Sequence, residues 1–368
     1  MAQMVIDKSA PTYIYHQVKD VIRRQVRDKK LRPGSKIGSV TEMARLFRIS
    51  PATVAKATAE LIDEGVLYSK IGRGTFVAEP SDRKTHTICF VVYSGDYVTQ
   101  PHFSQIIGGV SRVTEREHYK LQFITSARVV RAIDGAVPYP FIRESKWADG
   151  LIVMDDSLED SQVIRLAEGL PVVLINRRIP GTDIACVRAD GKGGTYQSIC
   201  HLAKLGHKRV GIYLTLESQA DQEKLLGYQA AVNEMGLDSD PDIVVDSAKQ
   251  RDVADMLDAL FSLPVRPTAI VVGSDIAAFG ALQMLREKNI RVPEDIAIMG
   301  FDGCLSDILP DLPLTTMQLP NMEMGKAAAD MLLGMINKKE VANKDIVFTP
   351  ELRVRQTCGG KERLQPVG

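Results

Sequence analysis

The feature that most constrains the fold of this chain is a short helical pattern that opens residues 39–77 and carries its own start signal. Ser39 is followed three positions later by Glu42, which is the spacing of a capping box. In a capping box each side chain accepts a hydrogen bond from the other residue's backbone N–H, so the helix begins without two unsatisfied donors. The pattern predicts an amphipathic helix over 40–47. Its apolar face is Val40, Met43, Ala44 and Phe47.

A second helical pattern follows after a turn of only a few residues. Ser50 is a favourable N-cap, and Pro51 suits the first helical position, where its missing N–H costs no hydrogen bond. Gly65 is placed to end the helix. Two short helices joined by so tight a turn are typical of a helix-turn-helix. The residues expected to face the core are Val54, Ala57, Leu61 and Ile62.

A hairpin pattern completes the segment. The strand expected over 66–71 leads into Gly72, Arg73 and Gly74, and a second strand is expected over 75–77. Glycines in this position supply the positive φ angles that a tight hairpin requires. The hairpin would place Arg73 at its tip, where a guanidinium can contact a DNA phosphate or the minor groove.

The outer face of the second helix carries small or hydrogen-bonding side chains near its N-terminus, and Ala55 is one of them. Such side chains allow a helix to approach base edges in the major groove of DNA. From the residues alone, an ordinary helical hairpin with a solvated polar face fits about equally well. The predicted DNA-contacting residues are Ser39, Thr41, Ser50, Ala52, Thr53, Lys56, Gly72 and Arg73.

The distribution of charge separates this segment from the rest of the chain, although the formal net charge of the whole sequence is zero. Residues 1–84 contain 16 Lys or Arg and 9 Asp or Glu, whereas residues 85–368 contain 30 and 37. A basic head on an acidic body is typical of a nucleic-acid-binding module attached to another domain. The charge pattern therefore favours DNA binding, with double-stranded operator DNA as the partner.

The first 80 or so residues resemble the GntR-type winged helix-turn-helix family. The resemblance implies an α+β DNA-binding domain, which we place at 1–78. The sequence departs from the family at Thr41, Pro51 and Ala55, where arginines are usual, so the operator of relatives does not transfer to this chain. Beyond the helix pair, the matching positions are a leading helix over 11–28, Leu31, Pro33, Gly34 and the closing run 72–76.

Composition and missing motifs argue against several other classes of protein. The five cysteines (Cys89, Cys186, Cys200, Cys304 and Cys358) are scattered without metal-ligand spacing, so we expect reduced thiols and no metal site. No apolar run approaches the roughly 18 residues of a membrane span, and no apolar signal region stands at the N-terminus. The motifs GxSxG and HExxH are absent, as is a GxGxxG after a strand. We therefore expect a cytoplasmic protein that is not an enzyme and has no cofactor.

A polar segment over 79–86, which we interpret as a linker, precedes a region in which apolar strand patterns alternate with helical patterns. Near-continuous apolar strands between helices predict parallel sheets that are covered on both faces. No period is visible over 126–147. The expected strands are 88–93, 120–125, 150–154, 171–175, 209–214, 242–246, 268–273 and 295–300, and the expected helices are 103–118, 158–168, 191–204, 221–235, 250–261 and 275–287.

Residues 87–357 resemble the effector-binding domain of the LacI/GalR family, which is itself similar to periplasmic sugar-binding proteins. The resemblance rests on an ordered set of motifs, because each motif alone is weak. The closing run 348–356, taken with the GntR-type head, looks especially like the arabinose-responsive repressors, and that combination covers the whole chain. The other motifs are 147–153 (WADGLIV), 205–210 (LGHKRV), Gly227 with Tyr228, Ser274 with Asp275, 280–282 (GAL), 292–295 (VPED), 300–302 (GFD) and 314–316 (LTT).

The resemblance implies a periplasmic-binding-protein-like domain of two α/β lobes joined by crossing strands. We place lobe one at 87–187 plus 317–342, lobe two at 188–316 plus 343–357, and a tail at 358–368. Ligands of open α/β sheets bind beyond the carboxyl ends of the strands, so the two lobes should enclose a cleft. By the resemblance, the expected effector is a small molecule, most simply a sugar.

Five residues are predicted to contact the effector: Phe103, Asn176, Lys224, Asp275 and Asp302. By the resemblance Asp275 accepts hydrogen bonds from sugar hydroxyls, although it fits an N-cap of the following helix equally well. Phe103 can stack on a sugar ring or be a core residue of its helix. Asn176 and Asp302 are polar, and each follows a strand. Lys224 stands where the family usually has an arginine, whose bidentate geometry an ammonium does not reproduce, so the identity of the ligand stays open.

These observations predict a transcription regulator, a repressor that binds a pseudo-palindromic operator as a homodimer and responds to a small ligand. Two alternatives are a sugar-binding receptor or scaffold without ligand-controlled DNA release, and a sugar-modifying enzyme. The basic head disfavours a receptor, and the missing catalytic motifs disfavour an enzyme.

Overall fold

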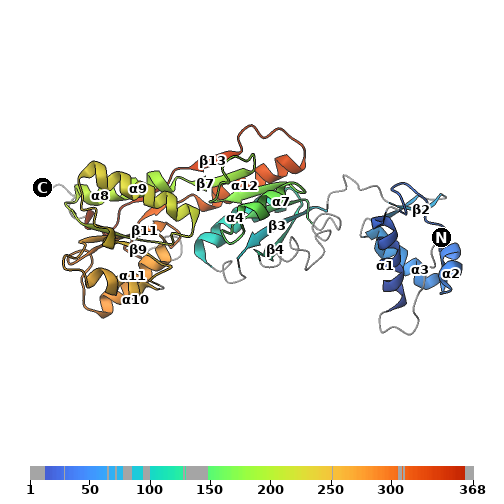
Figure 1. Ribbon diagram of the computed structural model, residues 1–368, viewed down its shortest axis with the longest axis horizontal. Coiled ribbons are helices and arrows are strands. Elements are labelled where there is room, and N and C mark those ends of the chain that lie inside the picture. Colours follow the sequence, from blue (N-terminus) through green and yellow to red (C-terminus); the bar gives the residue numbers. More distant parts are fainter. Residues whose placement is uncertain are drawn as a thin grey trace. The chain divides into compact units, whose positions relative to one another are not determined.

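The computed structural model describes residues 13–28, 30–63, 66–70, 73–77, 85–93, 100–126, 129, 148–250, 252–305, 309 and 311–360. The chain divides into two compact units, residues 1–84 and residues 85–368 (Figure 1). The expected linker is corrected at its end, because Thr85 and His86 belong to the second unit. Their backbone N–H groups donate to the two carboxylate oxygens of Asp149, each at 2.7 Å.

Within its described residues the first unit contains three helices and a two-stranded antiparallel hairpin, which confirms the winged helix-turn-helix. Val54, Ala57 and Leu61 are fully buried, and the apolar face of the preceding helix packs against them. The leading helix adds Val18 and Ile22 to the same core. The elements are α1 (Ile14–Arg27), α2 (Val40–Phe47), α3 (Pro51–Asp63), β1 (Leu67–Lys70) and β2 (Gly74–Val77).

The capping box at the start of α2 is formed in full. The Ser39 hydroxyl accepts the Glu42 N–H at 3.2 Å, and a Glu42 carboxylate oxygen accepts the Ser39 N–H at 2.7 Å. We expect Ser39→Ala to lower the free energy of unfolding of this unit by about 1 kcal/mol, because the Glu42 N–H loses its acceptor. Chemical denaturation followed by circular dichroism measures the change. Thr41→Ala, at an exposed position of the same helix, is the control, and an equal loss in both variants would contradict the capping role.

The second unit has two lobes, each built on a six-stranded sheet (Figure 1). The sheet of lobe one has the strand order β13-β7-β6-β5-β3-β4 and is parallel throughout. Helices α4 (Pro101–Arg116) and α12 (Asn321–Ile336) cover one face, and α7 (Asp160–Ala167) lies on the other. The strands are β3 (Thr87–Val92), β4 (Lys120–Thr125), β5 (Gly150–Val153), β6 (Val172–Ile175), β7 (Ala185–Ala189) and β13 (Asp345–Phe348).

Helices α4 and α12 approach each other closely at two glycines. A Cβ added to Gly109 would lie 2.1 Å from the Met322 carbonyl oxygen, and one added to Gly325 would lie 2.0 Å from the Ile106 carbonyl oxygen. Any larger residue at these positions would push the helices apart. This close contact therefore sets how α4 and α12 pack against each other on lobe one.

The sheet of lobe two has the strand order β14-β12-β11-β10-β8-β9, with only β14 antiparallel to its neighbour. Helices α8 (Gly191–Lys204) and α9 (Gln219–Met235) cover one face, and α10 (Val253–Phe261) and α11 (Asp275–Glu287) cover the other. The strands are β8 (Val210–Leu214), β9 (Val244–Asp246), β10 (Ala269–Val272), β11 (Ala297–Asp302), β12 (Thr315–Gln318) and β14 (Glu351–Arg353), and a 3₁₀ helix spans Pro241–Ile243.

The observed strand pairing corrects the predicted boundaries between the lobes. β13 pairs with β7 in lobe one, whereas the sequence predicts 343–357 in lobe two. The first crossing follows β7, which ends at Ala189, and the second follows β12, which ends at Gln318, each a little later than predicted. Cys358 is buried in the core of lobe two, so it is not part of a tail. These boundaries depend on which distant strands pair, and local patterns do not show that.

The predicted strands and helices of the second unit are otherwise present, with ends shifted by at most three residues. The segment 126–147, which showed no period, lies almost entirely outside the described residues. Among the described helices, none combines the length and the apolar character needed to cross a membrane.

Candidate functional site

The face of α3 that is predicted to contact DNA is exposed to solvent. Ala52, Ala55 and Lys56 are exposed and Thr53 is half-buried, whereas Val54 has no exposed surface. The small exposed side chains leave the N-terminal turn of α3 accessible to a ligand as large as a duplex. This is the arrangement that a recognition helix requires, because its first turns contact base edges.

Two of the hydroxyl groups that are predicted to contact DNA also cap the N-termini of helices. The Ser50 hydroxyl accepts the Thr53 N–H at 3.1 Å and lies 2.7 Å from the Thr53 hydroxyl, so this pair caps α3. Ser39 caps α2 as described above, and Thr41 is exposed on the same helix. A hydroxyl has one donor and two acceptor positions, so a capping bond leaves capacity for a phosphate or a base.

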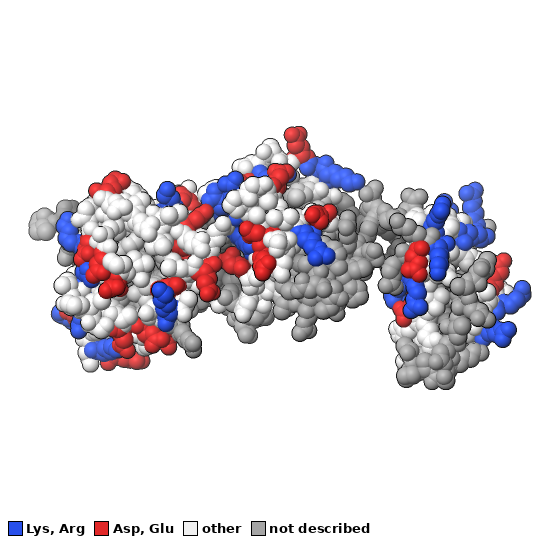
Figure 2. All heavy atoms as spheres, viewed as in Figure 1, with Lys and Arg blue, Asp and Glu red and all other residues white. Residues whose placement is uncertain are grey.

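The two predicted cations lie on different elements of the head. Lys56 Nζ is 4.1 Å from the ring centroid of Tyr15 in α1, a cation–π contact that orients the ammonium while its side chain stays exposed. Arg73 is exposed in the hairpin turn, where its backbone N–H donates to the Lys70 carbonyl at 2.9 Å. Gly72 lies outside the described residues. Figure 2 shows Lys and Arg side chains spread over the visible face of this unit, with fewer Asp and Glu.

A pocket lies between the two lobes of the second unit, near the carboxyl ends of several of their strands. Its volume is about 350 Å³ when the space open to solvent is included. It brings together three of the five predicted effector residues: Asn176, Lys224 and Asp302. The full lining is Asn176, Arg188, Ala189, Gly191, Ala220, Glu223, Lys224, Phe301, Asp302 and Leu319.

The other two predicted effector residues do not line this pocket. Phe103 is buried in the core of lobe one, which is the core alternative stated above. Asp275 is not the N-cap of α11, because Ser274 occupies that position and its hydroxyl accepts the Ala277 N–H at 3.3 Å. Asp275 is the first residue of the helix, and its Oδ1 accepts the Thr316 hydroxyl at 2.5 Å.

Lys224 is buried at the base of the pocket and has three partners. Its Nζ lies 2.8 Å from Asp221 Oδ1, donates to the Gly273 carbonyl at 2.8 Å, and sits 4.3 Å from the ring centroid of Phe301. Burial lowers the pKa of Lys224, but Asp221 and Asp302 outweigh burial and raise it above its ordinary value. The ammonium of Lys224 therefore stays protonated in the site at neutral pH.

Two carboxyl groups near this lysine have raised pKa values. Burial raises the pKa of Asp302 to about 8, although Lys224 lowers it. Burial raises the pKa of Asp275 to about 6, against the lowering effect of the Thr316 hydroxyl. Asp302 also has a φ of 107°, a backbone conformation that few residues other than glycine adopt. Such strain and shifted pKa values are features that gather at functional sites.

These pKa values predict how stability depends on pH. The pKa of Asp302 and that of Asp275 are raised in the folded state, so between about pH 4 and pH 8 the folded chain holds protons that the unfolded chain has released. The free energy of unfolding should therefore fall as the pH rises through this interval. Asp302→Asn should flatten the fall, by on the order of 1 kcal/mol per pH unit where it is steepest. Urea denaturation across the interval measures the slope, and an unchanged slope in the variant would refute the assignment.

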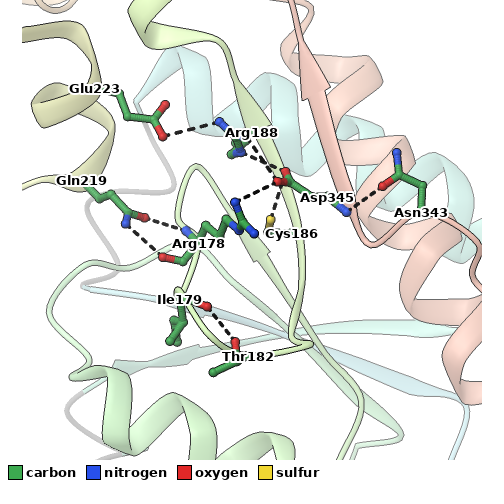
Figure 3. Close-up of polar contacts among 9 residues, drawn as sticks. All are labelled: Arg178, Ile179, Thr182, Cys186, Arg188, Gln219, Glu223, Asn343 and Asp345. Carbon is green, nitrogen blue, oxygen red and sulfur yellow. Dashed lines mark hydrogen bonds and ion pairs between the residues drawn. The ribbon is translucent and has the colours of Figure 1, made fainter. Parts of the chain in front are cut away.

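Two charged residues that line the pocket were not among the predicted effector residues. Arg188 lies in β7 and Glu223 lies in α9, so they come from different lobes, and Figure 3 shows them facing each other. The sequence signal that could have found Arg188 is a charged residue at the end of an otherwise apolar strand. Glu223 has no such signal, because a charged residue beside others on a helix is usually solvated.

Sequence profiles of known families match both units. Residues 14–77 match bacterial regulatory proteins of the gntR family, and residues 199–358 match the periplasmic binding protein-like domain. The first match ends with the wing, and the second contains most of lobe two together with α12 and β13 of lobe one.

Whole proteins of similar sequence and structure are transcription regulators. The chain is 29% identical over 369 residues to an arabinose metabolism transcriptional repressor of Geobacillus stearothermophilus, covering 95% of this chain and 98% of that one. It is 25% identical over 338 residues to a ribose operon repressor of Haemophilus influenzae, covering 87% and 98%. The crystal structure of transcription regulator CcpA of Lactococcus lactis matches 75% of this chain and 99% of its own, with a TM-score of 0.64 and 25% identity.

Proposed function

We infer that this chain, in which a GntR-type winged helix-turn-helix precedes a periplasmic-binding-protein-like domain homologous to that of LacI-type regulators, is a transcriptional repressor of sugar metabolism. The observation that carries the inference is the joint presence of an exposed recognition helix in one unit and a two-lobed pocket in the other. The relatives that span nearly the whole chain are repressors and not enzymes.

On this proposal the head binds operator DNA through α3. The exposed side chains of Ala52, Ala55 and Lys56 would face the major groove, and Arg73 in the hairpin turn would reach a phosphate or the minor groove. Two heads are needed to read a pseudo-palindromic operator, so the working form would be a homodimer acting in the cytoplasm. Half-sites one helical turn apart, roughly 34–36 Å, would demand a fixed spacing between the two heads.

The effector would be a sugar held between the lobes of the second unit. Supporting this are the polar lining from both lobes and the names of the relatives, one a repressor of arabinose metabolism and the other of a ribose operon. The ligand would hold the lobes in one relative orientation and so alter the spacing of the two heads. To change operator affinity a hundredfold, it needs about 2.7 kcal/mol of differential affinity for the two states of the protein.

The test joins DNA binding and ligand binding in one assay. Fluorescence anisotropy measures binding of the full chain to a labelled duplex from upstream of its own gene, at several salt concentrations and with a panel of pentoses and hexoses. We expect binding that weakens steeply with salt, because Lys and Arg release counterions from phosphates. One sugar should change the affinity at least about tenfold. Binding without salt dependence would contradict the DNA-binding head, and sugar binding that leaves DNA affinity unchanged would make the second unit a scaffold or a separate receptor.

A further inference from the structure

The two lobes are bridged on the α9 side of the pocket by contacts that involve no ligand (Figure 3). The Arg178 N–H donates to Gln219 Oε1 at 2.6 Å, and Gln219 Nε2 donates to the Arg178 carbonyl at 2.9 Å. Next to this pair, Arg188 Nη1 of lobe one lies 3.4 Å from Glu223 Oε1 of lobe two. We call this second contact the Arg188–Glu223 bridge. Because both of its residues line the pocket, it is at once a link between the lobes and part of the binding surface.

The guanidinium of this bridge is held rigidly from behind. Arg188 Nε donates to Asp345 Oδ1 at 2.9 Å, and Arg188 Nη2 donates to Asp345 Oδ2 at 3.2 Å. This is the bidentate geometry in which arginine binds a carboxylate most strongly. Arg188 lowers the pKa of Asp345, so that carboxylate is ionised at neutral pH. The guanidinium therefore faces the pocket already paired with Glu223 and with Asp345, which it shares with Arg178 Nη1 at 3.7 Å.

The other positive features of the pocket are matched in the same way. Lys224 is paired with Asp221, as described above. The N-terminus of α8, which could attract an anion, is capped by Asp190, whose Oδ1 accepts the Gly193 N–H at 2.8 Å. Asp302 adds a further carboxyl group to the lining. Among the described lining residues an anionic ligand would therefore meet no unmatched cation, and like charges brought together in a partly buried site repel.

We propose that the Arg188–Glu223 bridge is the charge filter of the effector pocket, so that the closed lobes admit neutral polyhydroxyl ligands and exclude sugar acids and sugar phosphates. The proposal rests on the proposed function and names the chemical class of its effector. Hydroxyl groups of a neutral sugar can donate to the Glu223 carboxylate and to the Asp302 carboxyl oxygens, and they can accept from the Asn176 amide. An ionised carboxylate or phosphate can accept from the Asn176 amide, but it cannot donate to the Glu223 carboxylate, and it can pair with Arg188 only by displacing Glu223.

Isothermal titration of the full chain with L-arabinose, D-ribose, L-arabinonate, D-ribonate and D-ribose 5-phosphate tests the filter. We expect a neutral sugar to bind at least about tenfold more tightly than its own aldonate. In Glu223→Gln the preference should shrink to within about threefold, because Arg188 loses its lobe-two carboxylate and can pair with that of the ligand. Glu287→Gln, which makes the same charge change at an exposed position of α11, should keep the wild-type preference.

Two results would overturn the proposal. One is an aldonate or the sugar phosphate binding the wild-type chain more tightly than the neutral sugars. The other is an unchanged preference in Glu223→Gln while that variant still binds the neutral sugar, which shows that it is folded. Operator binding measured in the same samples separates the two proposals. If an aldonate binds tightly and alters operator affinity, the repressor proposal stands and the charge-filter proposal is refuted. If a neutral sugar is preferred over its aldonate but leaves operator affinity unchanged, the charge-filter proposal is supported and control of DNA binding by the ligand is refuted.

Discussion

Replacing Ala52 by Asp is expected to weaken operator binding by at least about a hundredfold without unfolding the head. Ala52 is exposed in the first turn of α3, at the end that a recognition helix presents to base edges. A carboxylate there would face DNA phosphates and acceptor groups of the bases. The same carboxylate lies near the positive end of the helix dipole, so it should stabilise α3 by about 0.3–1 kcal/mol.

The opposite signs of these two effects make the test specific. Anisotropy with labelled operator measures the affinity, and chemical denaturation measures the stability. Ala342→Asp makes the same change at an exposed position of the second unit and should leave both quantities near their wild-type values. If Ala52→Asp binds the operator normally, the N-terminal turn of α3 does not lie at the DNA interface, and a different face of the head must be sought.

Replacing Lys224 by Met is expected to destabilise the second unit by about 3 kcal/mol and to abolish effector binding. The methionine has a similar length and fills the space, but it leaves the partly buried carboxylate of Asp221 without its cation. Removal of one member of a buried ion pair costs far more than the pair itself contributes, because the remaining charge is uncompensated. Asp302 adds little to this cost, because its pKa of about 8 keeps it mostly protonated at neutral pH.

A second substitution distinguishes this explanation from simple loss of packing. The double variant Asp221→Asn with Lys224→Met removes both charges, so it should recover at least half of the lost stability. Lys288→Met is the matched control, because its partner Asp258 is 2.8 Å away and both side chains are largely exposed. It should cost less than about 1 kcal/mol. Urea denaturation of all three variants gives the comparison, and a double variant no more stable than Lys224→Met would show that charge is not the cause.

The head could be predicted almost completely from sequence because its determinants are local. Caps, the proline at the start of α3 and the helical periods all act over three or four residues, and Ser39 and Ser50 perform the capping that their spacing predicted. What periodicity did not show was the position of Lys56 over the Tyr15 ring, since α1 and α3 meet only in the folded unit.

In the second unit the alternation of apolar strands and helices indicated the two sheets, but residues far apart in the chain decided the site. Phe103 became a core residue because α4 packs against α12, more than 200 positions later. Arg188 meets Glu223 across the lobes and Asp345 within its own sheet, at separations of 35 and 157 residues. Asp302 owes its raised pKa to burial beside groups of α9 and α11, which lie far from it in the sequence.

The sequence by itself therefore determined the helix-turn-helix, its capped ends, its basic charge and the parallel α/β character of the body, because each of these depends on neighbouring residues. Only the tertiary structure decided which strands cross between the lobes, which charges are matched in the pocket and which predicted residues reach it. Burial and ion pairing at these points depend on the order of strands in each sheet, and no local pattern of residues encodes that order.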